Sequence, residues 1–279
     1  MNEKNIKLFI CCHSKINFVP SLFIPIQCGA AINPPVPDTL SDNKGDNISS
    51  KNREYCELTA HYYVWKNIEA DFYGFCHYRR FFGFSANTKY PYLVCGKINE
   101  NERRFFCTKE QLDIMLSEYC VIAPRSENMG MPVKEHYCSS RFHYADDLEL
   151  FLSILIKDFP QISDTALEYL SQNRQYFCNM FIMDKEHFFE YCQILFLTLF
   201  KFDKLKIMHG SFQSDRTDGY LGEIFTGIYI SYLKKIGKKI KEIPRIDTNC
   251  TLKKKILYNF FPPESQRRFL AKKIVKSIL

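Results

Sequence analysis

The segment IKLFICCHSK, residues 6–15, indicates the architecture of this 279-residue chain. Its first part, Ile6 to Cys12, is apolar and partly β-branched, which predicts a buried strand, and the polar triplet His13-Ser14-Lys15 follows at once. A second apolar segment, Tyr73 to Tyr78, has the same form and ends in the charged pair Arg79-Arg80. Buried strands that end in polar clusters are typical of α/β domains whose ligands bind beyond the strand ends.

Segments with helical and strand periodicity alternate along the chain as far as residue 232. This alternation predicts an α/β domain over residues 1–250, with a mostly parallel central sheet flanked by helices. Residues 20–55 are rich in Pro, Asp, Asn and Ser and predict a long irregular segment. Further strands are expected at 120–123 and 176–183, and helices at 56–67, 109–119, 146–157, 164–172, 185–202 and 218–232.

The net charge of +7 is concentrated at the C-terminus. Residues 251–279 interleave Lys and Arg with Ile, Leu and Phe, and Glu264 is their one acidic residue. This pattern predicts a basic amphipathic helical tail that binds an anionic membrane surface. Nucleic acid is not an expected partner, because the basic residues gather in a tail and no base-stacking module is recognisable.

Other sequence features exclude several classes of protein. The 12 Cys residues are scattered without a CxxC pair, so they predict free thiols in a reducing compartment rather than a zinc ribbon. Phosphate-binding GxxxxGK[ST] and GxGxxG loops are absent, as are GxSxG and HExxH. We find neither an apolar window of about 18 residues nor a secretory signal, and therefore expect a cytoplasmic protein.

Three polar clusters could meet at the carboxyl edge of the sheet. They are residues 13–15, residues 77–80 and the segment from Arg216 to Glu223, and the loop around residues 45–47 could reach the same edge. Arginine forks pair with phosphate oxygens, and Lys or His can add positive charge, so these groups suit a nucleotide diphosphate. The alternative is that Arg79 and Arg80 form a solvated strand end and that His77 is a core histidine.

Several segments together resemble a domain of bacterial capsular and exopolysaccharide biosynthesis proteins, long classified as a domain of unknown function. Some members of that family are galactofuranosyltransferases with a modified GT-A fold. The resemblance implies a GT-A-like glycosyltransferase domain that moves a sugar from a nucleotide-sugar donor to a surface polysaccharide acceptor. The matching segments are FICCHSK (9–15), IPIQCGAAIN (24–33), GDNISSKNREYCELTAHYYVWKN (45–67), ADFYGFCHYRRFF (70–82), RFHYADDL (141–148), YFCNMFIMDKEHFFEYC (176–192) and DGYLGEIF (218–225).

The resemblance also implies a donor site. His-Tyr-Arg at 77–79 stands where an ordinary GT-A enzyme has its metal-binding Asp-x-Asp. Carboxylates suit a divalent cation, whereas these side chains suit direct neutralisation of phosphate, so we expect no metal. Asp42 and Asp46 are the residues that could hold Mn²⁺ or Mg²⁺ if one were needed. The donor-binding candidates are His13, Lys15, Asp46, Asn47, Glu57, His77, Tyr78, Arg79 and Arg80.

An inverting transfer needs a carboxylate that takes the proton of the acceptor hydroxyl. Glu223 is the first candidate for this base and Asp218 the second. A retaining transfer would need no such base, and Glu223 could equally be a first-turn glutamate that complements the helix dipole. The acceptor-binding candidates are Arg216, Tyr220 and His143.

The acceptor is expected to be a lipid-linked or growing glycan at the inner face of the plasma membrane, where the tail would hold the enzyme. One competing hypothesis is a non-catalytic module that binds nucleotide sugars or polysaccharide. A nucleotidyltransferase usually has a Gly-rich N-terminal loop, and residues 11–16 contain no Gly. A nucleic-acid-binding protein would show steeply salt-dependent binding.

Overall fold

The computed structural model describes residues 4–271 except 17, 97–104, 207–215 and 249. Its centre is a twisted sheet in the order β11-β7-β10-β4-β1-β2-β3. Strand β10 runs antiparallel to both of its neighbours, and the other pairings along this path are parallel. The expected mostly parallel sheet is thereby confirmed. The strands are β1 (Ile6–Cys12), β2 (Phe23–Gln27), β3 (Leu40–Ser41), β4 (Phe72–His77), β7 (Val121–Pro124), β10 (Phe181–Asp184) and β11 (Ile240–Ile243).

Shorter strands extend the sheet beside the end of β4. Strand β5 (Arg80–Phe82) turns back from β4 through the pair His77–Arg80. It is antiparallel to β12 (Arg245–Asp247), which is parallel to β6 (Tyr92–Val94). Strands β8 (Glu127–Asn128) and β9 (Arg174–Gln175) form a separate pair.

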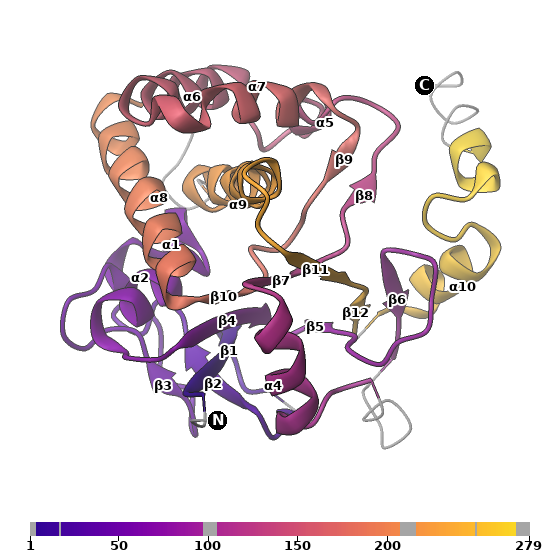
Figure 1. Cartoon of the computed structure of the whole chain (residues 1–279), viewed down its shortest axis with the longest axis horizontal. Coiled ribbons are helices and arrows are strands. Elements are labelled where there is room, and N and C mark those ends of the chain that lie inside the picture. Colours follow the sequence, from indigo (N-terminus) through magenta and orange to yellow (C-terminus); the bar gives the residue numbers. More distant parts are fainter. Residues whose placement is uncertain (1–3, 17, 97–104, 207–215, 249, 272–279) are drawn as a thin grey trace.

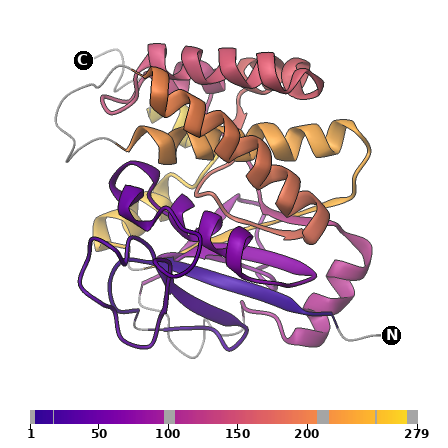
Figure 2. The same ribbon diagram turned by 90° about the vertical axis from the view of Figure 1, so that its left-hand side faces the viewer.

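Helices cover both faces of the sheet. Figures 1 and 2 show α8 and α9 over one face with α6 and α7 stacked outside them, and α4 on the opposite face. The helical segments are η1 (Ser49–Lys51), α1 (Asn52–Tyr55), α2 (Leu58–Asn67), α4 (Lys109–Glu118), α5 (Val133–Cys138), α6 (Ala145–Asp158), η2 (Pro160–Ile162), α7 (Ser163–Ser171), α8 (Lys185–Leu205), α9 (Thr217–Lys235) and α10 (Leu252–Phe260).

The apolar run of β1 is explained by burial on both of its faces. Phe9 and Cys11 belong to the core cluster under the helices α2 and α6 to α9. Leu8 and Ile10 belong to a second cluster, on the face that α4 covers. Because side chains alternate along a strand, a strand buried on both faces has no polar position, and this is why it is recognisable in the sequence.

The structure departs from the sequence predictions in three places. The strand expected at 176–183 is limited to β10, because the backbone before it turns through left-handed conformations at Cys178 and Asn179. Residues 20–55, expected to be irregular, contain β2, β3 and α1. Strands β11 and β12, which close the sheet after α9, were not anticipated.

The tail begins as expected with a helix, α10, whose N-cap Thr251 accepts a hydrogen bond from the Lys254 backbone. It packs back on the domain, where Tyr258 Oη donates to Tyr92 O at 3.0 Å and Lys254 pairs with Asp247 at 3.1 Å. The division of the chain at residue 250 stays a prediction. Among the described helices, none combines the length and the apolar character that crossing a bilayer requires.

Candidate active site

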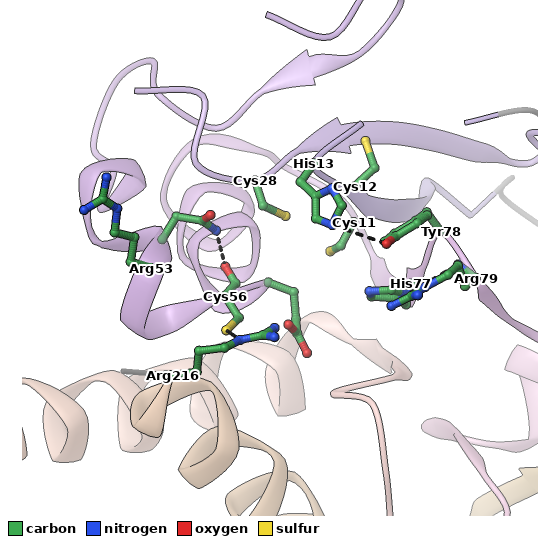
Figure 3. A pocket seen from close by; sticks show the side chains of 12 residues that line it. Cys11, Cys12, His13, Cys28, Arg53, Cys56, His77, Tyr78, Arg79 and Arg216 are labelled. Carbon is green, nitrogen blue, oxygen red and sulfur yellow. Dashed lines mark hydrogen bonds between the residues drawn. The ribbon is translucent and has the colours of Figure 1, made fainter. Parts of the chain in front are cut away.

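An open cavity of about 270 Å³ lies at the carboxyl ends of β1 and β4. Figure 3 shows the residues around it, which come from these strands, from the end of β2, from α1 and from the start of α9. Its lining residues are Cys11, Cys12, His13, Cys28, Asn52, Arg53, Cys56, Glu57, His77, Tyr78, Arg79 and Arg216.

Parallel pairing of β1 with β4 brings the two N-terminal polar clusters together. Cys11 is in register with His77, and the Tyr78 backbone N–H donates to Cys11 O at 3.1 Å. Beyond the strand ends, Tyr78 Oη and His13 Nε2 form a hydrogen bond of 3.2 Å. The prediction that these clusters share one edge of the sheet is confirmed.

His77 is a neutral group in this cavity. Burial lowers the pKa of its imidazole to about 3, and the neighbouring charges of Arg80 and Arg79 act in the same direction. The Arg79 backbone N–H donates to His77 Nδ1 at 3.3 Å, so the neutral ring carries its hydrogen on Nε2. His77 therefore offers a hydrogen-bond donor to a ligand, and the positive charge of the cavity comes from arginine.

Three arginines, Arg53, Arg79 and Arg216, line the cavity, and none forms an ion pair with a described residue. Figure 3 shows Arg79 and Arg216 directed into the cavity, whereas the exposed side chain of Arg53 extends from its rim. The Arg79 guanidinium lies 4.9 Å from the Tyr78 ring centroid, and Arg216 Nε donates to Cys56 Sγ at 3.1 Å. Among the described lining residues, Glu57 is the one carboxylate. Such an excess of unpaired guanidinium charge favours an anion with several oxygens.

The close approach of α9 to the cavity depends on Gly219. A Cβ at this position would lie 2.9 Å from Cys56 Sγ and 3.1 Å from Cys56 Cβ. Without that Cβ, the first turn of α9 packs directly on Cys56, and Arg216, which precedes the helix, reaches the cavity.

A turn before β10 contacts two carboxylates. Asn179 Nδ2 donates to Glu57 Oε1 at 2.9 Å, and the Cys178 backbone N–H donates to the carboxylate of Glu223. Both turn residues have positive φ, 80° at Cys178 and 46° at Asn179. Glu57 and Glu223 are thus held on either side of one short turn.

The carboxyl of Glu223, the first candidate for the base, has a raised pKa. Burial raises the pKa of its carboxyl to about 7, against the hydrogen bond from the Cys178 N–H. The negative charge of Glu57 adds to the rise in this pKa, whereas Arg80 and Arg245 oppose it. A pKa near the working pH is the condition under which a base is available and still accepts a proton readily.

The three acceptor-binding candidates lie together. The rings of His143 and Tyr220 are 4.3 Å apart, and the Arg216 guanidinium lies 5.9 Å from the Tyr220 ring. Burial lowers the pKa of His143, whose Nδ1 is 3.0 Å from Tyr137 O. His143, Tyr220 and Arg216 together form a surface of two aromatic rings and one guanidinium.

Several donor-binding candidates lie outside the cavity lining. Lys15 is exposed and is not a lining residue. Asp46 accepts a hydrogen bond from Tyr62 Oη of α2 at 3.1 Å, and Asn47 Nδ2 donates to Gly45 O within the loop at 2.9 Å, so both side chains already have partners away from the cavity. Arg80 is not a lining residue, and its charge lowers the pKa of both His77 and Glu223.

Asp218 is part of a buried ion cluster. Its carboxylate is fully buried and lies 2.8 Å from Lys206 Nζ. Lys206 also contacts Asp203 at 3.1 Å and Glu54 at 3.7 Å. Burial raises the pKa of Asp218, and the Asp203 charge adds to that rise. Neither Asp218 nor Glu223 lines the cavity, but Asp218 is committed to this cluster, whereas Glu223 shares the turn at residues 178–179 with the lining residue Glu57, which leaves Glu223 the stronger candidate.

Potential metal ligands gather elsewhere. Among the described residues, one group is Glu54, Asp203 and Asp218, where Lys206 already supplies the cation. The other group is Cys120, Asp184 and His187, and Asp184 pairs with Phe72, the first residue of β4, at the opposite end of the sheet from the cavity. Asp42, a further candidate, accepts hydrogen bonds from Gly29 N, Ala30 N and Ser49 Oγ and is fully buried.

Sequence reasoning did not single out Arg53, Asn52 or Asn179 as functional. Arg53 and Asn52 lie in the 45–67 segment that resembles the polysaccharide family, so the segment was noticed but not these side chains. Asn179 stands in an apolar run that suggests a strand. Its buried position and positive φ are visible only in the structure.

Comparison with known proteins agrees with this fold. The apo structure of WbbM, a bifunctional glycosyltransferase, superposes with a TM-score of 0.81 and 29% sequence identity. The match covers 88% of this chain and 46% of that one, so the chain spans about half the length of this relative. The GT-A-like architecture is confirmed. No curated protein matches the chain.

A family model described as "Domain of unknown function (DUF4422)" matches residues 7–235, which is most of the chain. This range contains every segment on which the resemblance to the polysaccharide biosynthesis family rests. The chain therefore belongs to the DUF4422 family.

Proposed function

We propose that the protein is a glycosyltransferase that uses a nucleotide-diphosphate sugar. The observation that carries this proposal is the group of unpaired guanidiniums, Arg53, Arg79 and Arg216, around one cavity at the carboxyl edge of the sheet. A leaving nucleotide diphosphate gains negative charge as its bond to the sugar breaks, and fixed positive charge stabilises that transition state. The likeness to WbbM supports the same activity.

The proposed reaction is an inverting transfer with Glu223 as the base. The acceptor hydroxyl oxygen forms a bond to the anomeric carbon of the donor while the bond from that carbon to the diphosphate oxygen breaks. The hydroxyl proton passes to Glu223, whose pKa of about 7 suits this step, and the bond electrons leave with the nucleotide diphosphate. The neutral His77 adds a hydrogen bond from Nε2, and no step requires a metal ion.

For the acceptor, we propose a lipid-linked or growing surface glycan. Tyr220 and His143 supply aromatic rings against which a sugar can stack, with Arg216 beside them. Some relatives transfer galactofuranose, and this sugar is the first donor to test. The nucleotide is expected to be UDP or a related diphosphate.

The tail would hold the enzyme at the inner face of the plasma membrane. Leu252, Ile256 and Phe260 are spaced four residues apart on α10 and are 74%, 48% and 64% exposed, and Lys253 is exposed beside them. An apolar stripe flanked by lysine is the pattern of a helix that lies on an anionic membrane. We expect deletion of residues 251–279 to release the protein from membranes while donor binding remains.

The test is a thermal-shift screen of nucleotide sugars, with and without Mn²⁺ or Mg²⁺. We expect a nucleotide sugar to stabilise the wild type without metal, and the shift to be lost in Arg79→Gln. Lys201→Gln, which alters an exposed ion pair with Asp158, is the matched control and should keep the shift. If no nucleotide sugar stabilises the wild type under either condition, the proposal is wrong.

A non-catalytic binding module is the competing function, and Glu223→Gln separates the two. An enzyme with this substitution should still bind the donor and lose transfer. In a binding module the substitution would change nothing, because there would be no turnover to lose.

A further inference from the structure

Cys178 and Asn179 form an unusual turn. Both residues adopt left-handed backbone conformations, with φ of 80° and 46°, and neither is glycine. Side chains with a Cβ are disfavoured there, although Asn tolerates the conformation better than most residues. Two such residues in succession persist only when the surroundings hold them, and strain of this kind tends to occur at functional sites.

The surroundings of Asn179 fix the orientation of its amide. Nδ2 faces two acceptors, Glu57 Oε1 at 2.9 Å and Gly219 O at 3.3 Å. The opposite orientation would place Oδ1 against both of these oxygens, so it is excluded by repulsion. On the other side, Thr226 Oγ1 donates to Asn179 Oδ1 at 3.0 Å.

The chain of hydrogen bonds continues into the core. Because the Thr226 hydroxyl hydrogen is directed to Asn179 Oδ1 and Gly222 O, Tyr191 is the donor in its 2.9 Å contact with Thr226. Tyr191, Thr226 and Asn179 are all buried. The amide that meets Glu57 is therefore held by buried groups on α8 and α9.

We propose that Asn179 is a positioning residue that sets the relation between the two carboxylates of the site. Its side chain orients Glu57 toward the cavity, and its backbone turn presents the Cys178 N–H to Glu223. The inference rests on the proposed function and extends it. It explains how Glu57 can face the ligand while Glu223, the proposed base, has a separate environment.

Asn179→Asp is the informative substitution. It keeps the size of the side chain and tolerates the left-handed backbone, but it replaces the amide donor by a third carboxylate beside Glu57. Like charges in contact disfavour ionisation, so we expect the titration midpoint of Glu57 to rise by roughly one pH unit, and that of Glu223, on the other side of the turn, to rise by less. We expect sugar transfer to fall at least about tenfold, with kcat affected more than KM, since Asn179 itself does not line the cavity.

Asn179→Gly is the second variant, because glycine adopts the turn without strain and this variant should fold. It removes the amide and adds no charge. We expect a loss of kcat without the upward shift of the Glu223 midpoint. Lys201→Gln again serves as the control that changes neither quantity.

The midpoints are measured by NMR titration of protein labelled with ¹³C at the Glu side-chain carboxyl, with Glu57→Gln and Glu223→Gln spectra for assignment. This measurement needs no substrate, so it tests the inference even if no nucleotide sugar binds. A raised Glu57 midpoint in Asn179→Gly, where the amide donor is lost and no charge is added, supports the positioning role. A Glu57 midpoint identical in wild type and Asn179→Gly would overturn it, whatever the outcome of the donor screen.

Discussion

Two charged regions lie on either side of the short helix α1, and they differ in how their charges are balanced. In the Lys206 cluster, one buried ammonium contacts Glu54, Asp203 and Asp218. Around the cavity, guanidiniums of neighbouring segments have no described carboxylate partner. In the first region the opposite charges meet within the protein, whereas in the second the guanidiniums are open to the anion that we propose. Substitutions should therefore separate stability from function.

The largest effect is expected from Glu223→Gln. The substitution keeps the size of the side chain and removes its ability to accept a proton, and loss of a general base typically lowers the rate by about 10²–10⁴-fold. Sugar transfer measured with the donor found in the screen should fall by this amount, and donor affinity should stay near that of the wild type. A fall in affinity with unchanged turnover would assign Glu223 to binding.

Lys206→Met should have a large effect on the free energy of unfolding and not on the chemistry of transfer. Removal of one partner from a buried ion cluster leaves uncompensated charge, which costs about 3–5 kcal/mol. Chemical denaturation should show a loss of this size at pH 7. Arg79→Gln, on the other side of the comparison, should change the free energy of unfolding by less than about 0.5 kcal/mol. Equal losses in the two variants would contradict the distinction between the regions.

The stability of the protein should also depend on the protonation of Glu223. A carboxyl whose pKa is raised in the folded state contributes stability at low pH and loses it as the pH rises through about 7. Glu223→Gln removes this dependence. The free energy of unfolding of the variant, relative to that of the wild type, should therefore rise by roughly 1–3 kcal/mol when the pH is raised from 5 to 8. Denaturation at both pH values gives the comparison, and a constant difference would place the Glu223 pKa near its ordinary value.

The smallest effects should come from the tail. Each Lys or Arg near anionic lipid contributes about 1 kcal/mol, so Lys253→Gln and Arg267→Gln should each weaken binding to phosphatidylserine vesicles about fivefold. Sedimentation with these vesicles provides the measurement, and Lys201→Gln is the control. If the wild-type protein does not sediment with the vesicles, the proposal that the tail binds membranes is wrong.

Much of the fold could be predicted from the sequence, because β1 and β4 are buried on both faces and therefore read as unbroken apolar runs. The edge at which His13 and His77 meet followed from parallel pairing. The two-residue strand β3 and the late strands β11 and β12 were missed because such short segments carry little periodic signal.

The site was predicted in outline and not in its details. Asp218 and Glu223 stand five residues apart on one helix and look equivalent as bases, but only the fold brings Lys206 to Asp218 and the Cys178 N–H to Glu223. Asp46 is hydrogen-bonded to Tyr62 of α2 and Asn47 to Gly45 of its own loop, which the sequence around them does not reveal. Contacts between distant segments decided each of these roles.

The claim that three guanidiniums of this cavity bind a nucleotide diphosphate is tested most directly by calorimetric titration of UDP into the wild type and into Arg53→Gln, Arg79→Gln and Arg216→Gln. We predict metal-independent binding to the wild type that each substitution weakens roughly tenfold or more, since a hydrogen bond to a charged group contributes about 1.5–3 kcal/mol. Binding of equal strength in the wild type and all three variants would contradict the claim.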